Sequence, residues 1–162
     1  MTTVTLRPAT PADIPFIMAT ERRPGYEPLV GRFPEEEHRT YLADDDWRYF
    51  IGLDETGTAQ GFAILQNVKT ETDAQFLRRI VVVDAGKGFG RVFLCAVVDW
   101  VFANMDVDRF WFSVRNTNER ARHVYRSLGF KEDGPEPGDA SSSIMSTTRA
   151  SWAALTAARA PR

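Results

Sequence analysis

The sequence predicts a mixed α/β fold in which helices cover the faces of a central sheet, and three observations support this prediction. First, β-branched and aromatic residues gather in three consecutive segments separated by polar turns: Trp47–Leu53, Gln60–Val68 and Gln75–Val83. Second, helices and strands alternate along the rest of the chain. Third, the connection between Val83 and Arg109 contains a helix and is long enough to join parallel strands. We expect a single domain over residues 1–162.

The N-terminal segment predicts a strand followed by two helices. Thr3–Arg7 alternates apolar and polar residues, as a strand does. Thr10 precedes Pro11 in the pattern of a helix start, and we expect this helix to end near Glu21. A second helix is expected over Glu35–Leu42, because acidic residues in the first turn interact favourably with the helix dipole.

The segment Arg22–Pro34 is expected to be a loop, because prolines and glycines interrupt it throughout. It also contains apolar residues such as Tyr26, Leu29 and Phe33. Two interpretations stay open for them. The loop covers a binding site, or it is a surface connector whose aromatic side chains pack into the core.

The second half of the chain predicts the following elements in order. They are a helix whose apolar residues recur from Phe89 to Val101 and include the apolar stretch Val92–Met105, a strand over Arg109–Arg115, and a helix over Asn116–Leu128 capped near Asn116 or Thr117. They continue with a strand from Phe130 to Asp133, an open turn over Gly134–Gly138, a final strand over Ser141–Arg149 and a short helix over Ala150–Arg162 that frays as a C-terminal tail. Gly129 is the expected left-handed stop of the second of these helices.

Composition and charge exclude several classes of function. A net charge of −2 gives no electrostatic reason to expect a nucleic-acid partner. No apolar run is long enough to span a bilayer, and the first residues lack the pattern of a signal peptide. Cys95 is the single cysteine, so no intrachain disulfide forms, and we expect a cytoplasmic protein. No spacing of His, Cys, Asp and Glu predicts a metal site.

The stretch from Ile80 to Arg91 predicts an anion-binding loop. A β-branched run ends at Val83 and is followed by glycines at 86, 88 and 90, and then by an apolar helix. The first turn of a helix has unpaired backbone N–H groups and the positive end of the dipole. Glycines before it let phosphate oxygens approach the backbone closely, and Lys87 and Arg91 add positive charge. A pyrophosphate is the expected ligand.

Neither common nucleotide motif fits this loop. The Walker pattern requires Ser or Thr after its Lys, whereas Gly88 follows Lys87. The dinucleotide fingerprint places its third glycine three residues after the second, whereas Gly90 follows Gly88 by two. The alternative is that the three glycines only form a turn between a strand and a helix.

A second block is more specific. Asn118, Ala121, Tyr125, Gly129 and Phe130 follow the spacing Asn-x-x-Ala-x-x-x-Tyr with a terminal Gly-Phe. Taken together with Gly86–Arg91, this block resembles the GNAT superfamily of acyl-CoA-dependent N-acetyltransferases. The resemblance extends over Gln75–Glu132, and the order of elements in the whole chain agrees with it. The residues around Ile144 and Trp152 are similar to the branch related to ribosomal-protein N-terminal acetyltransferases.

The resemblance implies a mostly antiparallel sheet with helices on both faces. It also implies a splayed pair of parallel strands that forms the cofactor cleft, with acetyl-CoA as the co-substrate. The residues that would bind it are Ile80, Val81 and Val82 along the pantetheine arm, Gly86, Lys87, Gly88, Phe89, Gly90 and Arg91 at the pyrophosphate, and Asn118 and Tyr125 beside the arm. A backbone N–H near Val82 would stabilise the oxyanion, as the resemblance implies.

The activity implied is transfer of an acetyl group to a primary amine, a small molecule or a peptide N-terminus, by direct attack in a ternary complex. Asn118 and Tyr125 lie two turns apart on one helix face, and Tyr125 is the implied general acid for the departing thiolate. In isolation each has a structural alternative: Asn118 as a helix cap and Tyr125 as a half-buried core residue. Dimers are common in the family, so a homodimer is compatible with the resemblance.

Two departures from the family pattern bear on activity. Ala85 stands where the family usually has Gln or Arg, and Gln75 and Phe76 occupy the neighbourhood of the usual catalytic Glu. The general base therefore stays open among acidic residues and a water relay; the acidic candidates are Glu21, Glu27 and Asp73. The rival hypothesis is a non-catalytic module that binds acyl-CoA in the same cleft. A third is an unrelated nucleotide-binding domain.

Overall fold

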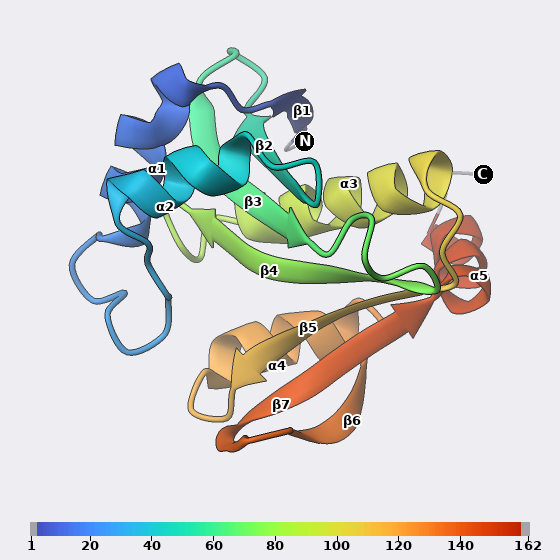
Figure 1. Cartoon of the computed structure of the whole chain (residues 1–162). Helices are drawn as coiled ribbons and strands as arrows, with labels where there is room; N and C mark the ends of the chain where they lie inside the picture. The colour runs from blue at the N-terminus through green and yellow to red at the C-terminus, as the bar shows by residue number, and fades with distance from the viewer. Residues whose placement is uncertain (1–2, 160–162) are drawn as a thin grey trace.

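The computed structural model describes residues 3–159, and a seven-stranded sheet runs through it (Figure 1). The strands are β1 Thr5–Pro8, β2 Trp47–Leu53, β3 Ala59–Gln66, β4 Ala74–Val82, β5 Arg109–Arg115, β6 Lys131–Glu136 and β7 Asp139–Thr148. Their order across the sheet is β1-β2-β3-β4-β5-β7-β6, and every neighbouring pair is antiparallel except β4 and β5. The mixed, mostly antiparallel sheet expected from the sequence is confirmed.

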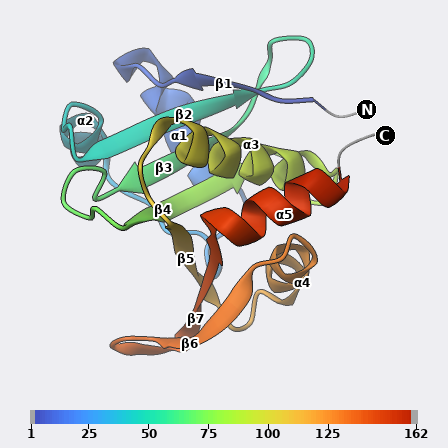
Figure 2. The same ribbon diagram turned by 90° about the vertical axis from the view of Figure 1, so that its right-hand side faces the viewer.

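Helices cover both faces of this sheet, as Figures 1 and 2 show from two directions. They are η1 Pro11–Asp13, α1 Ile14–Glu21, α2 Glu35–Leu42, α3 Phe89–Asn104, α4 Glu119–Ser127 and α5 Arg149–Arg159. Side chains of α3, α4 and α5 share one apolar core with the strands, whereas α1 and the segment around Phe33 form a second core on the opposite face. In the part of the chain described, no helix has the length and apolar character needed to cross a membrane.

Strands β4 and β5 pair over a short distance and then separate. Their parallel register covers only Ala74–Phe76 against Arg109–Trp111. Beyond it β4 continues beside β3, with a bulge at Arg78, because Leu65 pairs with Leu77 while Ile64 pairs with Arg79. A bulge increases the local twist of a strand. The result is the splayed parallel pair that the family resemblance implied, and residues 77–82 of β4 have no ladder partner on β5.

One of two helix starts beside the cavities agrees with the sequence prediction and the other differs from it. The helix after the glycine loop begins at Phe89, where the predicted apolar periodicity also begins, and Gly88, with φ 85°, acts as its N-cap. The next helix begins at Glu119, and its cap is Asn118 rather than Asn116 or Thr117. Several polar residues near a helix start can act as the cap. The helix starts after the one whose side chain accepts from the free backbone N–H groups.

The prediction of an open turn over Gly134–Gly138 is wrong. Strand β6 continues to Glu136 and pairs with β7, so the turn is confined to Pro137 and Gly138. Gly134 and Pro135 are typical of turns, so the sequence does not indicate a strand at these residues. In the structure, β6 is an edge strand of the sheet. A proline is tolerated there because an edge strand can lack a ladder donor, and Gly134 with φ 117° lies at a register shift.

The C-terminal segment forms α5, which packs against α3. The Trp152 indole N–H donates to Asp99 Oδ1 at 2.7 Å, and the Trp152 side chain is buried. Arg149 donates to three backbone carbonyls, those of Phe102, Met105 and Val107. Residues 160–162, the end of the helix expected over Ala150–Arg162, lie outside the described residues.

Candidate active site

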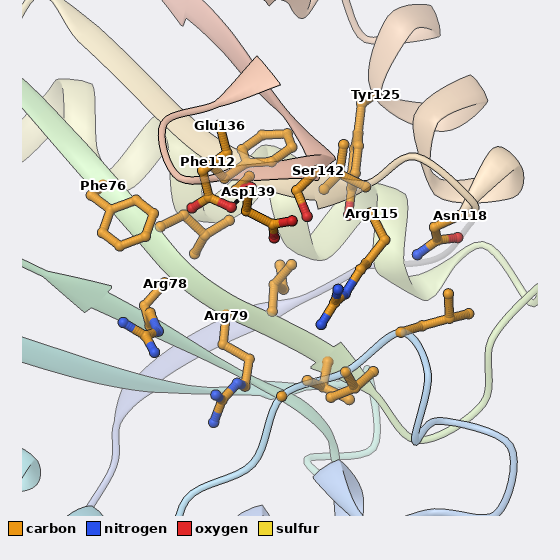
Figure 3. A pocket seen from close by; sticks show the side chains of 18 residues that line it. Phe76, Arg78, Arg79, Phe112, Arg115, Asn118, Tyr125, Glu136, Asp139 and Ser142 are labelled. Carbon is orange, nitrogen blue, oxygen red and sulfur yellow. Dashed lines mark hydrogen bonds between the residues drawn. The ribbon is translucent and has the colours of Figure 1, made fainter. Parts of the chain in front are cut away.

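Two adjoining cavities lie where β4 and β5 separate. We call the first the arginine-lined cavity; it has a volume of about 370 Å³ and is bounded by β4, β5 and the β6–β7 hairpin (Figure 3). We call the second the glycine-loop cavity; it has a volume of about 650 Å³ and lies between the glycine loop and α4. Six residues line both: Leu29, Val30, Ile80, Val81, Asn118 and Tyr125. The two cavities therefore meet at one boundary in the splay.

The glycine loop places backbone N–H groups at the edge of the glycine-loop cavity. Gly86 and Gly88 both have positive φ, 86° and 85°, which side chains of L-residues rarely adopt. A Cβ atom at Gly86 would collide with the Arg120 guanidinium, so Arg120 lies directly against the loop. This arrangement brings the N-terminus of α3 and one guanidinium to the same place, and both favour an anion.

The other residues predicted in this loop lie in different surroundings. Gly86, Gly88, Gly90 and Arg91 line the cavity. The Arg91 side chain donates to Ser127 Oγ at 2.8 Å. Lys87 is 74% exposed and lies 3.7 Å from Asp84, whereas Phe89 packs in the core beside Phe93. Neither Lys87 nor Phe89 lines either cavity.

The end of β4 forms the wall between the cavities. Ile80 and Val81 line both cavities, and Val82 lines the glycine-loop cavity. The Tyr26 hydroxyl donates to the Val82 carbonyl at 2.7 Å. The loop Arg22–Pro34 thus contacts β4. Each of the two interpretations of its apolar residues holds for some of them: Leu29 and Val30 line the cavities, whereas Phe33 is buried in the core.

Asn118 and Tyr125 project from α4 toward the boundary. Asn118 Oδ1 accepts from the Ala121 N–H at 3.3 Å and caps the helix, which leaves its amide NH₂ without a bond among residues 3–159. The Tyr125 ring contacts Phe112 edge-on, with centroids 4.6 Å apart, and within the described chain its hydroxyl has no hydrogen-bond partner. Burial raises the pKa of Tyr125 to about 12. The phenol therefore stays protonated at neutral pH.

Five charged side chains surround the arginine-lined cavity, as Figure 3 shows: Arg78, Arg79, Arg115, Glu136 and Asp139. Arg78 and Arg79 come from the bulge of β4, and Arg115 from the end of β5. Glu136 and Asp139 flank the β6–β7 turn. The sequence indicates the Gly134–Ser143 stretch as a candidate lining of the acceptor pocket, but it does not single out Glu136 or Asp139, because the hairpin that positions them is expected to be an open turn.

The carboxylates considered from the sequence lie elsewhere. Glu27 is exposed and accepts from Gly25 N, and Asp73 precedes β4 at the far end of the splay. Glu21 is fully buried. None of the three lines either cavity. Gln75 is also buried and donates to two carbonyls, whereas Phe76 lines the arginine-lined cavity and stacks on Trp111.

Glu21 is instead the centre of a buried ion network. Its carboxylate accepts from Arg22 at 2.6 Å, Arg79 at 2.9 Å, His38 at 2.8 Å and the Phe33 N–H at 3.3 Å. Burial alone would raise the pKa of Glu21, but the hydrogen bond and charge of His38 and the charge of Arg79 offset it and lower the pKa. The network holds Arg79 at the cavity wall and joins both ends of the loop.

The sequence matches the family profile described as Acetyltransferase (GNAT) domain over residues 3–131, which is most of the chain. The chain belongs to the GNAT acetyltransferase family. This GNAT chain is 27% identical to spermidine N(1)-acetyltransferase of Vibrio cholerae over 101 residues, 62% of this chain and 58% of the relative. It is 29% identical to streptothricin acetyltransferase of Streptomyces lavendulae over 119 residues, 66% of this chain and 59% of the relative.

The GNAT chain thus spans just under three fifths of the length of these curated relatives. Among solved structures, the spermidine N-acetyltransferase from Vibrio cholerae in complex with CoA and spermine has a TM-score of 0.80. The match covers 93% of this chain and 98% of that one at 20% identity. It confirms the GNAT fold. The similarity to the ribosomal-protein branch stays a prediction.

Proposed function

We propose that this GNAT protein transfers the acetyl group of acetyl-CoA to a primary amine by direct attack in a ternary complex. The observation that carries the proposal is the boundary between the two cavities, where Asn118 and Tyr125 each line both of them. A thioester lying in the glycine-loop cavity would present its carbonyl carbon to an amine in the arginine-lined cavity. Holding two reactants in this way is a large part of catalysis.

The cofactor would lie along β4 and α4. The pyrophosphate would bind the N–H groups of Gly86–Arg91, with Arg120 as an additional cation that the sequence did not suggest. The pantetheine arm would pair with those backbone groups of residues 80–82 that face β5 and have no partner on it, the Val82 carbonyl being bonded to Tyr26. The free amide of Asn118 would donate to the arm. Arg120 also replaces the phosphate contact that Ala85 cannot supply.

The chemistry requires a base and an acid. Glu136 is our candidate base, because it lines the arginine-lined cavity and its side chain accepts only one hydrogen bond among residues 3–159, from Ser113 Oγ at 3.0 Å. Asp139 is less suitable: hydrogen bonds from the Ser141 hydroxyl and N–H lower the pKa of Asp139. Glu136, directly or through water, would take the proton of the ammonium.

The neutral amine would then attack the thioester carbonyl, forming a C–N bond, an oxyanion and a positively charged nitrogen, which would lose one proton through water to solvent. A backbone N–H of β4 near Val82 would donate to that oxyanion. On collapse the C–S bond breaks and the sulfur leaves with the bonding electrons. The Tyr125 hydroxyl, which lines the boundary and is protonated, would donate its proton to the thiolate and then take up a proton from solvent.

Calorimetry of acetyl-CoA, CoA, ATP and NAD tests the cofactor first, followed by an assay of CoA release with a panel of amines. Micromolar binding of acetyl-CoA and CoA alone, about −8 kcal/mol, with turnover of at least one amine supports the proposal. Tight binding without turnover of any amine favours the non-catalytic module instead. Equal binding of ATP or NAD favours an unrelated nucleotide-binding function.

A further inference from the structure

The charges of the arginine-lined cavity are only partly neutralised by the protein. Arg79 is paired with Glu21 at 2.9 Å. Arg78 and Arg115 have no carboxylate within 4.0 Å among residues 3–159. Arg78 donates to the neutral Gln66 side chain at 3.2 Å, and Arg115 donates to Ser141 Oγ at 3.4 Å. Two guanidinium groups are therefore available to a ligand.

The opposite side of the cavity carries negative charge. Glu136 and Asp139 accept hydrogen bonds from Ser113 and Ser141, and within the described chain neither has a cation within 4.0 Å. Figure 3 shows both carboxylates on the hairpin side of the cavity and Arg78 with Arg79 on its β4 side, with the Arg79 guanidinium turned toward Glu21. The cavity is thus a dipolar site with two free cations and two free anions.

These charges discriminate between classes of amine. A polyamine would bring a second ammonium toward Arg78 or Arg115, and like charges repel in a partly desolvated cavity. An amine without a second charge would leave the guanidinium groups unpaired. A guanidinium binds a carboxylate through two parallel hydrogen bonds, so a ligand with one ammonium and one carboxylate complements both walls.

We propose that the acceptor is a small amine that also bears a carboxylate, such as an amino acid or a short peptide. Its carboxylate binds Arg78 and Arg115, and its ammonium lies beside Glu136. This inference rests on the proposed acetyl transfer and narrows it to one substrate class. It differs from the polyamine and the antibiotic that the names of the curated relatives give for those proteins.

The test compares matched amines that differ only in the second charge. Glycine, glycylglycine and 4-aminobutyrate are each assayed beside the corresponding amide, together with butylamine, 1,4-diaminobutane and spermidine. We expect kcat/KM for the best acid to exceed that of its amide by about tenfold or more. The amine of an α-amino amide is less basic and more of it is neutral, so the chemistry alone favours the amide. The ranking within the acids distinguishes a free amino acid from a peptide.

Two variants test whether the preference for acids over amides arises in the arginine-lined cavity. Arg78→Gln and Arg115→Gln are expected to raise KM for the acid about tenfold and to leave the amide within about twofold. Arg48→Gln is the matched control, because Arg48 is exposed on β2 and lines neither cavity. Binding of acids and amides to the CoA-loaded protein is measured in parallel by calorimetry.

The outcomes separate the two proposals. Preferred turnover of spermidine or of the amides overturns the acceptor class and leaves acetyl transfer standing. Saturable binding of an acid that is lost in Arg78→Gln, without turnover of any amine, overturns acetyl transfer and supports the dipolar site. If no acid binds or reacts, the acceptor inference is wrong.

Discussion

The Tyr26 hydroxyl donates to the Val82 carbonyl at 2.7 Å and so joins the loop after α1 to the end of β4. The two residues are 56 positions apart in the sequence. Leu29 and Val30, whose N–H groups donate to the Tyr26 carbonyl, are thereby held over both cavities. This hydrogen bond therefore helps to hold the wall of the proposed site in place.

Replacing Tyr26 with Phe should loosen that wall. The variant keeps the ring and loses a hydrogen bond that contributes about 1 kcal/mol. We expect faster amide hydrogen exchange at Leu29 and Val30, measured by NMR. Tyr41→Phe is the control, since the Tyr41 hydroxyl binds Glu37 in α2, away from the cavities. Equal exchange rates in wild type and Tyr26→Phe would contradict the anchoring role.

Replacing Tyr125 with Phe should reduce kcat and leave cofactor binding nearly unchanged. The hydroxyl has no partner among the described residues, so its removal disturbs no internal hydrogen bond. General acid catalysis contributes at least about 10²-fold, and kcat should fall by this factor. Stopped assays give kcat, and calorimetry gives the acetyl-CoA Kd. An unchanged kcat would remove Tyr125 from the mechanism.

The pH dependence of kcat follows from the pKa of Tyr125. Burial raises this pKa to about 12 from an ordinary value of 10.0, and the protonated phenol is the donating form. That form persists until the pH approaches the raised pKa, so kcat should show no loss from this group up to about pH 10. A pH profile under saturating substrate checks this. A descending limb with an apparent pKa near 9 that disappears in Tyr125→Phe would contradict it.

Replacing Arg120 with Gln should weaken acetyl-CoA binding. Its guanidinium lies against Gly86, where the pyrophosphate is proposed to bind. Loss of one charge-assisted contact to a phosphate is expected to raise Kd by about tenfold and to reduce the salt dependence of binding. Arg126→Gln is the control, because Arg126 lies on the same helix, pairs with Glu132 and lines neither cavity. Equal effects of the two variants would rule out a specific contact.

Replacing Glu21 with Gln should destabilise the fold. The variant leaves the buried Arg79 without its partner, and breaking a buried pair in this way costs about 3 kcal/mol or more. Urea unfolding at neutral pH measures it. Glu27→Gln, an exposed carboxylate of the adjoining loop, should have no measurable effect.

The same network predicts a pH dependence of stability. The folded pKa of Glu21 is lowered below its ordinary value of 4.5, so the unfolded state binds the proton more readily. The stabilisation is therefore fully present above about pH 4.5 and is lost as the pH falls through the lowered folded value. The difference between wild type and Glu21→Gln should shrink on acidification. A difference that grows toward low pH would contradict the lowered pKa.

The sequence predicted those parts of the molecule that local patterns determine. The strand before Val83, the glycine loop and the helix after it follow from β-branched residues, glycines and apolar periodicity within a short stretch. Asn118 and Tyr125 were found because their spacing matches a family motif on one helix face. These signals need no knowledge of distant contacts.

The remaining site residues depend on contacts between distant parts of the chain. Arg120 contacts the glycine loop only because α4 packs beside it. Glu136 reaches the cavity because it ends an edge strand, and the sequence does not indicate that strand because Gly134 and Pro135 are typical of turns. Glu21 is buried because Arg79, 58 residues away, supplies the countercharge. A lone acidic residue at a helix end has no local feature that distinguishes it from solvated surface.

Glu21 bonds both ends of the Arg22–Pro34 loop, so the position of the loop's base does not depend on the sequence of its tip. One carboxylate binds Arg22 at the beginning of the loop and the Phe33 N–H near its end, so the base of the loop is fixed whatever lies between. Insertions and substitutions at the tip alter the cavity wall without moving β4 or the reacting groups. We therefore expect changes at the tip of this loop to alter the wall of the proposed acceptor cavity, while the sheet that would hold the cofactor keeps its geometry.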